Sequence, residues 1–126
     1  MAVDCNLEAA EETKHLIAEE GGECLTFKAD VSKASDCESM IGTCIQKFGR
    51  IDILHNNVGI GQWGGAVETD EETWDKVMKV NVKSMFLTCK HVIPCMEKQG
   101  GGAITNIASI AAIRTPMPNV AYSASK

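Results

Sequence analysis

Apolar residues recur along this chain in two alternating patterns, which predict strands and helices in turn. Short apolar runs predict strands at residues 1–4, 24–29, 51–55 and 103–107. Longer stretches with apolar residues three or four positions apart predict helices at residues 7–20, 32–48, 70–99 and from about 119 onward. Such alternation is typical of an α/β fold, here a doubly wound parallel sheet with four strands and about four helices.

Residues with capping preferences flank the predicted helices. Asn6 is expected to cap the first helix, and glycines at 21–22 and 49 are expected to end the first two. Capping boxes, in which Ser or Thr precedes Glu by three positions, are expected to open the next two helices; the pairs are Ser35 with Glu38 and Thr69 with Glu72.

The long helix at 70–99 is expected to bury one apolar stripe. The members of this stripe are Trp74, Val77, Met78, Val82, Met85, Phe86 and Cys89. Pro94 is expected to kink the helix or to mark a break near its end.

Polar residues closely follow the predicted strands. They are Asp4, Asp30, Asn57 and Ser109. In a doubly wound sheet the ligand crevice lies at the carboxyl ends of the strands. A cofactor site is therefore expected at this edge, whereas His55, inside an apolar strand, is interpreted as a packed core histidine.

Composition narrows the class of protein. The formal net charge of −5 lacks the basic footprint of a nucleic-acid-binding surface. No apolar run approaches the length of a membrane span, and the first residues do not read as a secretory signal. The six cysteines do not show metal-ligand spacing and are interpreted as small buried side chains. These features predict a cytoplasmic protein without a metal, a membrane partner or a nucleic-acid partner.

Tyr122 and Lys126 lie four positions apart, so on a helix they share one face. A lysine ammonium beside a phenol favours the phenolate, because opposite charges attract. Such a tyrosine can exchange a proton with an alcohol or a carbonyl near neutral pH. Alone, the pattern YxxxK is a weak signal, since many surface helices contain it by chance.

Further motifs accompany this pair in a fixed order. They are the Asp of AVDCN, the pair Asp30–Val31, NNVG at 56–59, the Asn of VN at 80–81, the Ser of IASI and YSASK at 122–126. As a set they resemble the short-chain dehydrogenase/reductase family across nearly the whole chain.

The resemblance implies catalytic roles for four residues. Tyr122 would be the general acid/base, and Lys126 would activate it and hold the nicotinamide ribose. Ser109 would bind the reacting oxygen. Asn81 would position a water that links Lys126 to solvent as a proton relay.

The resemblance also implies a nicotinamide cofactor. The residues that would contact it are Asp4, Asp30, Val31, Asn57, Val58, Gly59, Tyr122 and Lys126. The family usually has Ala at the position of Val58. The larger valine side chain would crowd the adenosine ribose. A carboxylate at Asp4 can bind the ribose 2′-hydroxyl of NAD and would repel the 2′-phosphate of NADP, so NAD is the expected cofactor.

By the same resemblance, residues 1–126 would form a partial NAD(P)-binding domain of the Rossmann-like type, with an incomplete sheet. Family members begin with a strand and a TGxxxGIG turn, and they continue beyond the catalytic lysine. The opening strand would lie between the strands ending at Asp4 and His55, whose edges are expected either to stay open or to pair with each other. The isolated chain is therefore expected to be marginally stable and inactive.

The predicted function is an NAD-dependent interconversion of a hydroxyl and a carbonyl by hydride transfer, on a small-molecule substrate. The full-length protein is expected to be a homodimer or homotetramer. One alternative is an NADP-dependent carbonyl reductase of the same family, and another is a non-catalytic binding module. An NDP-sugar epimerase also uses YxxxK, but NNVG does not fit that group. The loop at 110–119 is expected to line a partly apolar substrate pocket.

Overall fold

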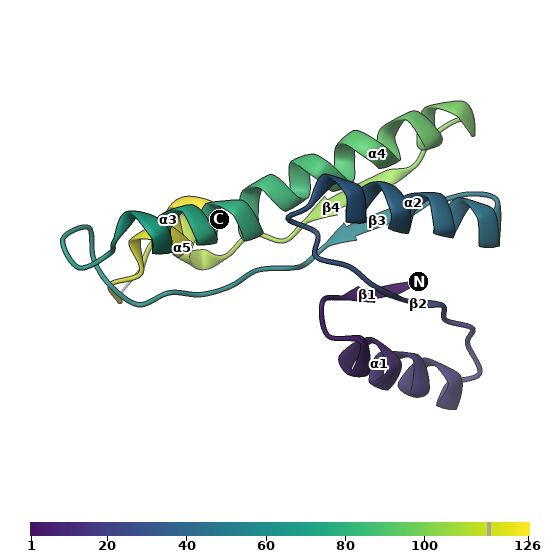
Figure 1. Ribbon diagram of the computed structural model, residues 1–126, viewed down its shortest axis with the longest axis horizontal. Coiled ribbons are helices and arrows are strands. Elements are labelled where there is room, and N and C mark those ends of the chain that lie inside the picture. The colour runs from purple at the N-terminus through teal and green to yellow at the C-terminus, as the bar shows by residue number, and fades with distance from the viewer. Residues whose placement is uncertain (116) are drawn as a thin grey trace.

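The computed structural model describes residues 1–115 and 117–126, so Pro116 of the predicted pocket loop lies outside the described residues. Strands and helices alternate as predicted (Figure 1). The strands are β1 (Ala2–Asp4), β2 (Thr26–Lys28), β3 (Ile53–Asn56) and β4 (Ala103–Asn106). The helices are α1 (Leu7–Glu19), α2 (Ala34–Phe48), α3 (Glu71–Met78), the π-helix η1 (Lys79–Lys83), α4 (Ser84–Lys98), the 3-10 helix η2 (Ile110–Ala112) and α5 (Val120–Ser125). The α/β prediction is confirmed.

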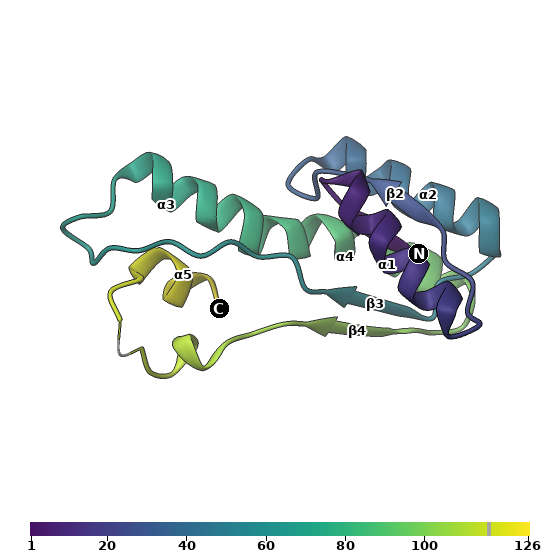
Figure 2. The same ribbon diagram turned by 90° about the horizontal axis from the view of Figure 1, so that it is seen from below.

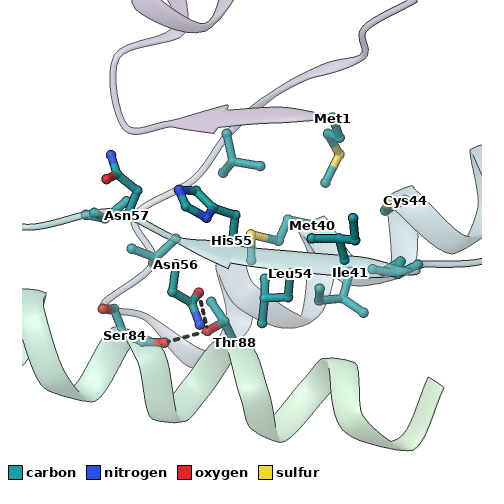
Figure 3. A pocket seen from close by; sticks show the side chains of 15 residues that line it. Met1, Met40, Ile41, Cys44, Leu54, His55, Asn56, Asn57, Ser84 and Thr88 are labelled. Atoms are coloured by element: carbon teal, nitrogen blue, oxygen red, sulfur yellow. Dashed lines mark hydrogen bonds between the residues drawn. The ribbon is translucent and has the colours of Figure 1, made fainter. Parts of the chain in front are cut away.

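The strands form two parallel pairs and not one continuous sheet. Strand β1 pairs with β2, with Ala2 opposite Thr26, and β3 pairs with β4, with Ile53 opposite Ala103. Strands β1 and β3 run in the same direction but are separated by a cavity of about 250 Å³ (Figure 3). The expectation of open edges is confirmed, and the alternative of direct pairing between these two strands is wrong.

Packing against shared helices explains the separation of β1 from β3. Helices α2 and α4 pack together on one side of the strands, while α1 packs against β1 and β2 on the other side (Figures 1 and 2). Val3 of β1 and Leu54 of β3 both pack against one core cluster, so this cluster sets the spacing of the two strands. The buried members of that cluster are Ala29, Met40, Ile41, Ile51, Val92 and Met96.

Local capping follows the prediction for the first helix. The Asn6 side chain accepts a hydrogen bond from the Glu8 amide at 3.1 Å, which satisfies one of the free N–H groups at the start of α1. Gly49 ends α2 in the left-handed region, with φ of 78°, where a residue without a β-carbon is favoured.

Both predicted capping boxes are wrong. Helix α2 begins at Ala34 after Lys33, and the Ser35 hydroxyl bonds to its neighbour Asp36. Helix α3 is capped by Asp70, whose carboxylate accepts a hydrogen bond from the Thr73 amide at 2.6 Å. A carboxylate one position after Thr69 is the stronger acceptor, because it carries a charge.

The break in the long helix also differs from the prediction. Pro94 lies inside α4, and the regular helix is interrupted earlier, at η1. A π-helical turn contains an extra residue, which rotates the following side chains around the axis. Two predicted stripe members are therefore exposed, namely Val82 at 39% and Phe86 at 61%. Trp74, which precedes η1, is also exposed, at 37%. The buried positions are Val77, Asn81, Ser84, Leu87, Thr88, Val92 and Met96.

The cysteines are all free thiols. Cys37 is buried, as expected, whereas Cys5 is exposed because it lies in the turn between β1 and α1. Across the described residues, no helix combines the length and the apolar character needed to cross a membrane.

Candidate active site

The carboxyl ends of β3 and β4 are joined by side chains. The Asn56 amide donates to the Asn106 side-chain oxygen at 2.9 Å across the strand pair. Asn56 also accepts a hydrogen bond from the Thr88 hydroxyl of α4, again at 2.9 Å (Figure 3). This amide pair, in which Asn56 is buried and Asn106 is exposed, aligns the two segments that follow, which carry Gly59 and Ser109.

Ser109 lies between β4 and η2 with an extended backbone. Its hydroxyl oxygen accepts a hydrogen bond from the Ala111 amide at 3.2 Å. This bond uses an acceptor lone pair, so the Ser109 O–H can still donate to a ligand. Helix η2 packs against α5, which brings Ser109 to the side of the molecule that carries Tyr122.

Tyr122 and Lys126 lie side by side on α5 and its end. The Lys126 ammonium nitrogen is 5.8 Å from the centre of the Tyr122 ring, within range of a cation–π interaction. The same nitrogen donates to the Ile107 carbonyl at 3.0 Å, two residues before Ser109. Lys126 therefore ties the helix of Tyr122 to the end of β4 and has two N–H groups left for other acceptors.

Asn81, in η1, is fully buried and makes three hydrogen bonds. Its Oδ1 accepts from the Ile60 amide at 2.8 Å, and its Nδ2 donates to the Ile60 carbonyl at 3.0 Å and to the Ser125 hydroxyl at 2.8 Å. Gly59 lies beside this amide and the lysine. A β-carbon at position 59 would lie 3.1 Å from Lys126 Nζ and 3.5 Å from Asn81 Oδ1, so glycine leaves the space that the ammonium occupies.

Two carboxylates lie at the ends of β1 and β2. One oxygen of Asp4 accepts a hydrogen bond from the Asn6 amide at 2.8 Å. Asp30 accepts from the Ser32 hydroxyl at 2.7 Å and from the Ser32 amide at 3.1 Å. The Ser32 hydroxyl is the main reason that the pKa of Asp30 lies below its ordinary value, with partial burial opposing and Lys33 assisting the shift. Both carboxylates have the acceptor capacity that a ribose or an adenine amine requires.

Comparison with known proteins identifies the family. A family model described as short chain dehydrogenase matches residues 1–126. The chain belongs to the short chain dehydrogenase family. It is 43% identical over 123 residues to an uncharacterized oxidoreductase of Thermotoga maritima, covering 98% of this chain and 48% of that relative.

Solved structures of short chain dehydrogenases have the same fold. A short-chain dehydrogenase/reductase from Burkholderia xenovorans matches with a TM-score of 0.95 and 40% identity, covering 98% of this chain and 49% of that protein. NAD+-bound xylitol dehydrogenase matches with a TM-score of 0.93 and 30% identity, covering 98% and 48%. The chain thus spans about half the length of the relatives that it matches.

The remaining residues predicted to contact a cofactor lie around the cavity between β1 and β3. Val31, Asn57 and Val58 line that cavity, and Figure 3 labels Asn57. Val58 is 40% exposed. Val31 also packs against the core cluster. His55 lines the same cavity and is exposed, so its interpretation as a core histidine is wrong. The reason is that β3 has no paired strand on its β1 side.

Three further residues organise the candidate site and were not predicted from the sequence. Asn56 and Ser125 are buried polar residues with partners distant in sequence, so only their motifs, NNVG and YSASK, could have indicated them. Gly64 forms an isolated parallel bridge with Asn119, donating to the Pro118 carbonyl at 2.8 Å and accepting from the Val120 amide at 3.1 Å. Its φ of 133° favours glycine, and the bridge fixes the start of α5.

Proposed function

We propose that the protein containing this chain is an NAD-dependent oxidoreductase that interconverts a hydroxyl and a carbonyl by hydride transfer. The observation that carries the proposal is the Lys126 ammonium, 5.8 Å from the Tyr122 ring and bonded to the segment that leads to Ser109. A phenol, an ammonium and a hydroxyl in this relation provide a proton-exchange group, a charge that stabilises its ionised form and a donor for the substrate oxygen.

The proposed mechanism assigns each proton to a residue of this chain. In the oxidation direction, Ser109 donates a hydrogen bond to the substrate oxygen while the Tyr122 phenolate takes the hydroxyl proton. Lys126 stabilises the phenolate and contributes its remaining N–H groups to the ribose of the cofactor. When bound, the nicotinamide supplies the hydride acceptor. Asn81 completes the route of the proton to solvent through a water near Lys126.

Asp4 supports NAD over NADP. One of its oxygens is held by the Asn6 amide, which fixes the carboxylate at the carboxyl end of β1. A fixed carboxylate accepts a hydrogen bond from a ribose 2′-hydroxyl and repels a 2′-phosphate. Gly59 supports close approach of the cofactor, since a β-carbon there would fill the space beside Lys126. An NADP-dependent carbonyl reductase would instead prefer NADPH and would be unaffected in cofactor choice by Asp4→Asn.

Assembly of the proposed enzyme from identical subunits is supported by an exposed face on α3, η1 and α4. Trp74, Val82, Phe86 and Ile93 are apolar and exposed there, and a second copy would cover them. This chain by itself is proposed to be inactive, and the complete protein to act on small-molecule alcohols or carbonyls in the cytoplasm.

The test is to express the complete gene and to screen alcohols and polyols for reduction of NAD, with NADP in parallel. Tyr122→Phe should reduce turnover by at least about a hundredfold, because it removes only the proton-exchanging oxygen. Turnover by Tyr122→Phe at the wild-type rate would refute the proposed role. Absence of turnover on every substrate with either cofactor would favour the non-catalytic binding module.

A further inference from the structure

Ser125 lies at the centre of a buried hydrogen-bond cluster beneath Tyr122 and Lys126. Its side-chain oxygen accepts a hydrogen bond from Asn81 Nδ2 at 2.8 Å and its O–H donates to the Tyr122 carbonyl at 2.7 Å. Ser125 is 8% exposed and Asn81 is fully buried. A buried polar group that loses its hydrogen-bond partner destabilises the fold. Each bond in this cluster therefore stabilises the protein and also fixes the positions of the side chains that it joins.

The direction of each hydrogen bond in the cluster is determined. The Tyr122 carbonyl can only accept, so the Ser125 hydroxyl donates to it and offers a lone pair to Asn81. Asn81 must then point Nδ2 toward Ser125. This orientation also places Oδ1 opposite the Ile60 amide and the second N–H of Nδ2 opposite the Ile60 carbonyl. Ser125 and Ile60 together therefore allow only one orientation of the Asn81 amide.

We propose that Ser125 is a positioning residue, whose hydroxyl locks α5 onto Asn81 and so holds Tyr122 and Lys126 in place for catalysis. This inference rests on the proposed function. The Asn81–Ser125 bond joins the side chain of a residue in α5 to a fully buried side chain in η1. Ser125 immediately precedes Lys126, so movement of one moves the other. While the Ser125–Asn81 hydrogen bond is intact, the Lys126 ammonium stays beside Gly59 and bonded to the Ile107 carbonyl.

Helix α5 offers a matched control in Ser123. The Ser123 hydroxyl also makes a local hydrogen bond, to Asn119 Oδ1 at 2.7 Å, but it has no bond to Asn81. Ser125→Ala and Ser123→Ala therefore remove the same group from the same helix, and only the first removes the link to η1. The comparison separates the positioning role from a general effect of losing a serine in α5.

The experiment uses the complete gene product with NAD. Ser125→Ala should lower kcat about tenfold with KM changed less than about twofold, because a misplaced group costs rate without touching the substrate. Ser123→Ala should match the wild type. The double variant Asn81→Ala with Ser125→Ala should be no slower than Asn81→Ala alone.

A second readout does not depend on activity. With asparagine labelled by ¹⁵N, the Asn81 side-chain N–H signals should exchange slowly in the wild type and in Ser123→Ala, and rapidly in Ser125→Ala. If the wild type has no turnover, the proposed function fails, but this comparison still tests whether Ser125 holds Asn81 in place. Equal kcat or equal exchange in the two alanine variants overturns the inference. If Ser125→Ala does not fold, Ser125→Cys replaces it, because a thiol is a weaker donor of similar size. Its kcat should lie below that of the wild type, and a wild-type kcat would overturn the inference.

Discussion

Gly59→Ala is expected to separate the stability of this protein from its catalytic competence. A β-carbon at position 59 would lie 3.1 Å from Lys126 Nζ, 3.5 Å from Lys126 Cε and 3.5 Å from Asn81 Oδ1. The first distance is shorter than ordinary van der Waals contact, so the end of the lysine side chain must move by a few tenths of an ångström. That movement strains the 3.0 Å bond from Nζ to the Ile107 carbonyl.

The two effects of this substitution differ in size and in sign. Gly59 does not adopt a positive φ, so alanine fits the backbone and should stabilise the fold by about 0.4–1 kcal/mol through the unfolded state. The displaced lysine is flexible and offsets part of that gain. For catalysis, a misplacement of about 1 Å can cost roughly a hundredfold. A few tenths of an ångström at Lys126 should then lower kcat by about three- to tenfold.

The assay combines thermal unfolding with steady-state kinetics of the complete gene product. Gly61→Ala is the matched control, because Gly61 has open space around its would-be β-carbon and no positive φ. We expect both variants to unfold within about 1 kcal/mol of the wild type, and only Gly59→Ala to be slow. If the two variants turn over equally fast, the position of the Lys126 ammonium does not govern the rate and the reasoning fails.

Three further predictions concern the fold. Gln99→Ala should lower the free energy of unfolding by about 1–3 kcal/mol in a urea titration, because the Gln99 amide bonds both backbone groups of Ile51, at 3.1 and 2.7 Å; an unchanged midpoint would contradict this. Because the pKa of Asp30 is lowered in the folded protein, its ionised carboxylate stabilises the fold. This stabilisation is complete above the ordinary aspartate pKa and is lost as the pH falls through the lowered value. Asp30→Asn should therefore show a smaller loss of melting temperature on acidification than the wild type, and an equal loss would refute the link. Leu87→Ala, at a position only 4% exposed, should cost about 2–5 kcal/mol, whereas Phe86→Ala should cost less than about 1 kcal/mol in this chain. The reverse order would show that the buried face of α4 is not the one that contains Leu87.

Much of the fold was predictable from local chemistry. The Asn6 cap, the glycine at the end of α2 and the alternation of strands with helices depend on neighbouring residues and on periodicity. The placement of Asn57 and Ser109 after adjacent parallel strands follows from the same alternation. The pairing of Tyr122 with Lys126 was also predictable, because four positions on a helix bring two side chains to one face.

Other features could not be read from local patterns. The rotated face of α4 depends on η1, and a π-helical turn leaves no periodic signal in a count of apolar residues. The buried face moreover includes Asn81, Ser84 and Thr88, which such a count treats as exposed. The role of Ser125 depends on a partner 44 residues away, and only the folded chain brings these two residues together.

The division of the strands into two pairs has a consequence for how this chain behaves in solution. Two separate pairs present four strand edges, whereas a single sheet of the same strands would present two. Each edge carries N–H and C=O groups that can recruit an extended segment from any neighbouring molecule. Loss of monomer at high concentration should therefore proceed through intermolecular β-structure, and an excess of a short extended peptide that fits between β1 and β3 should slow it.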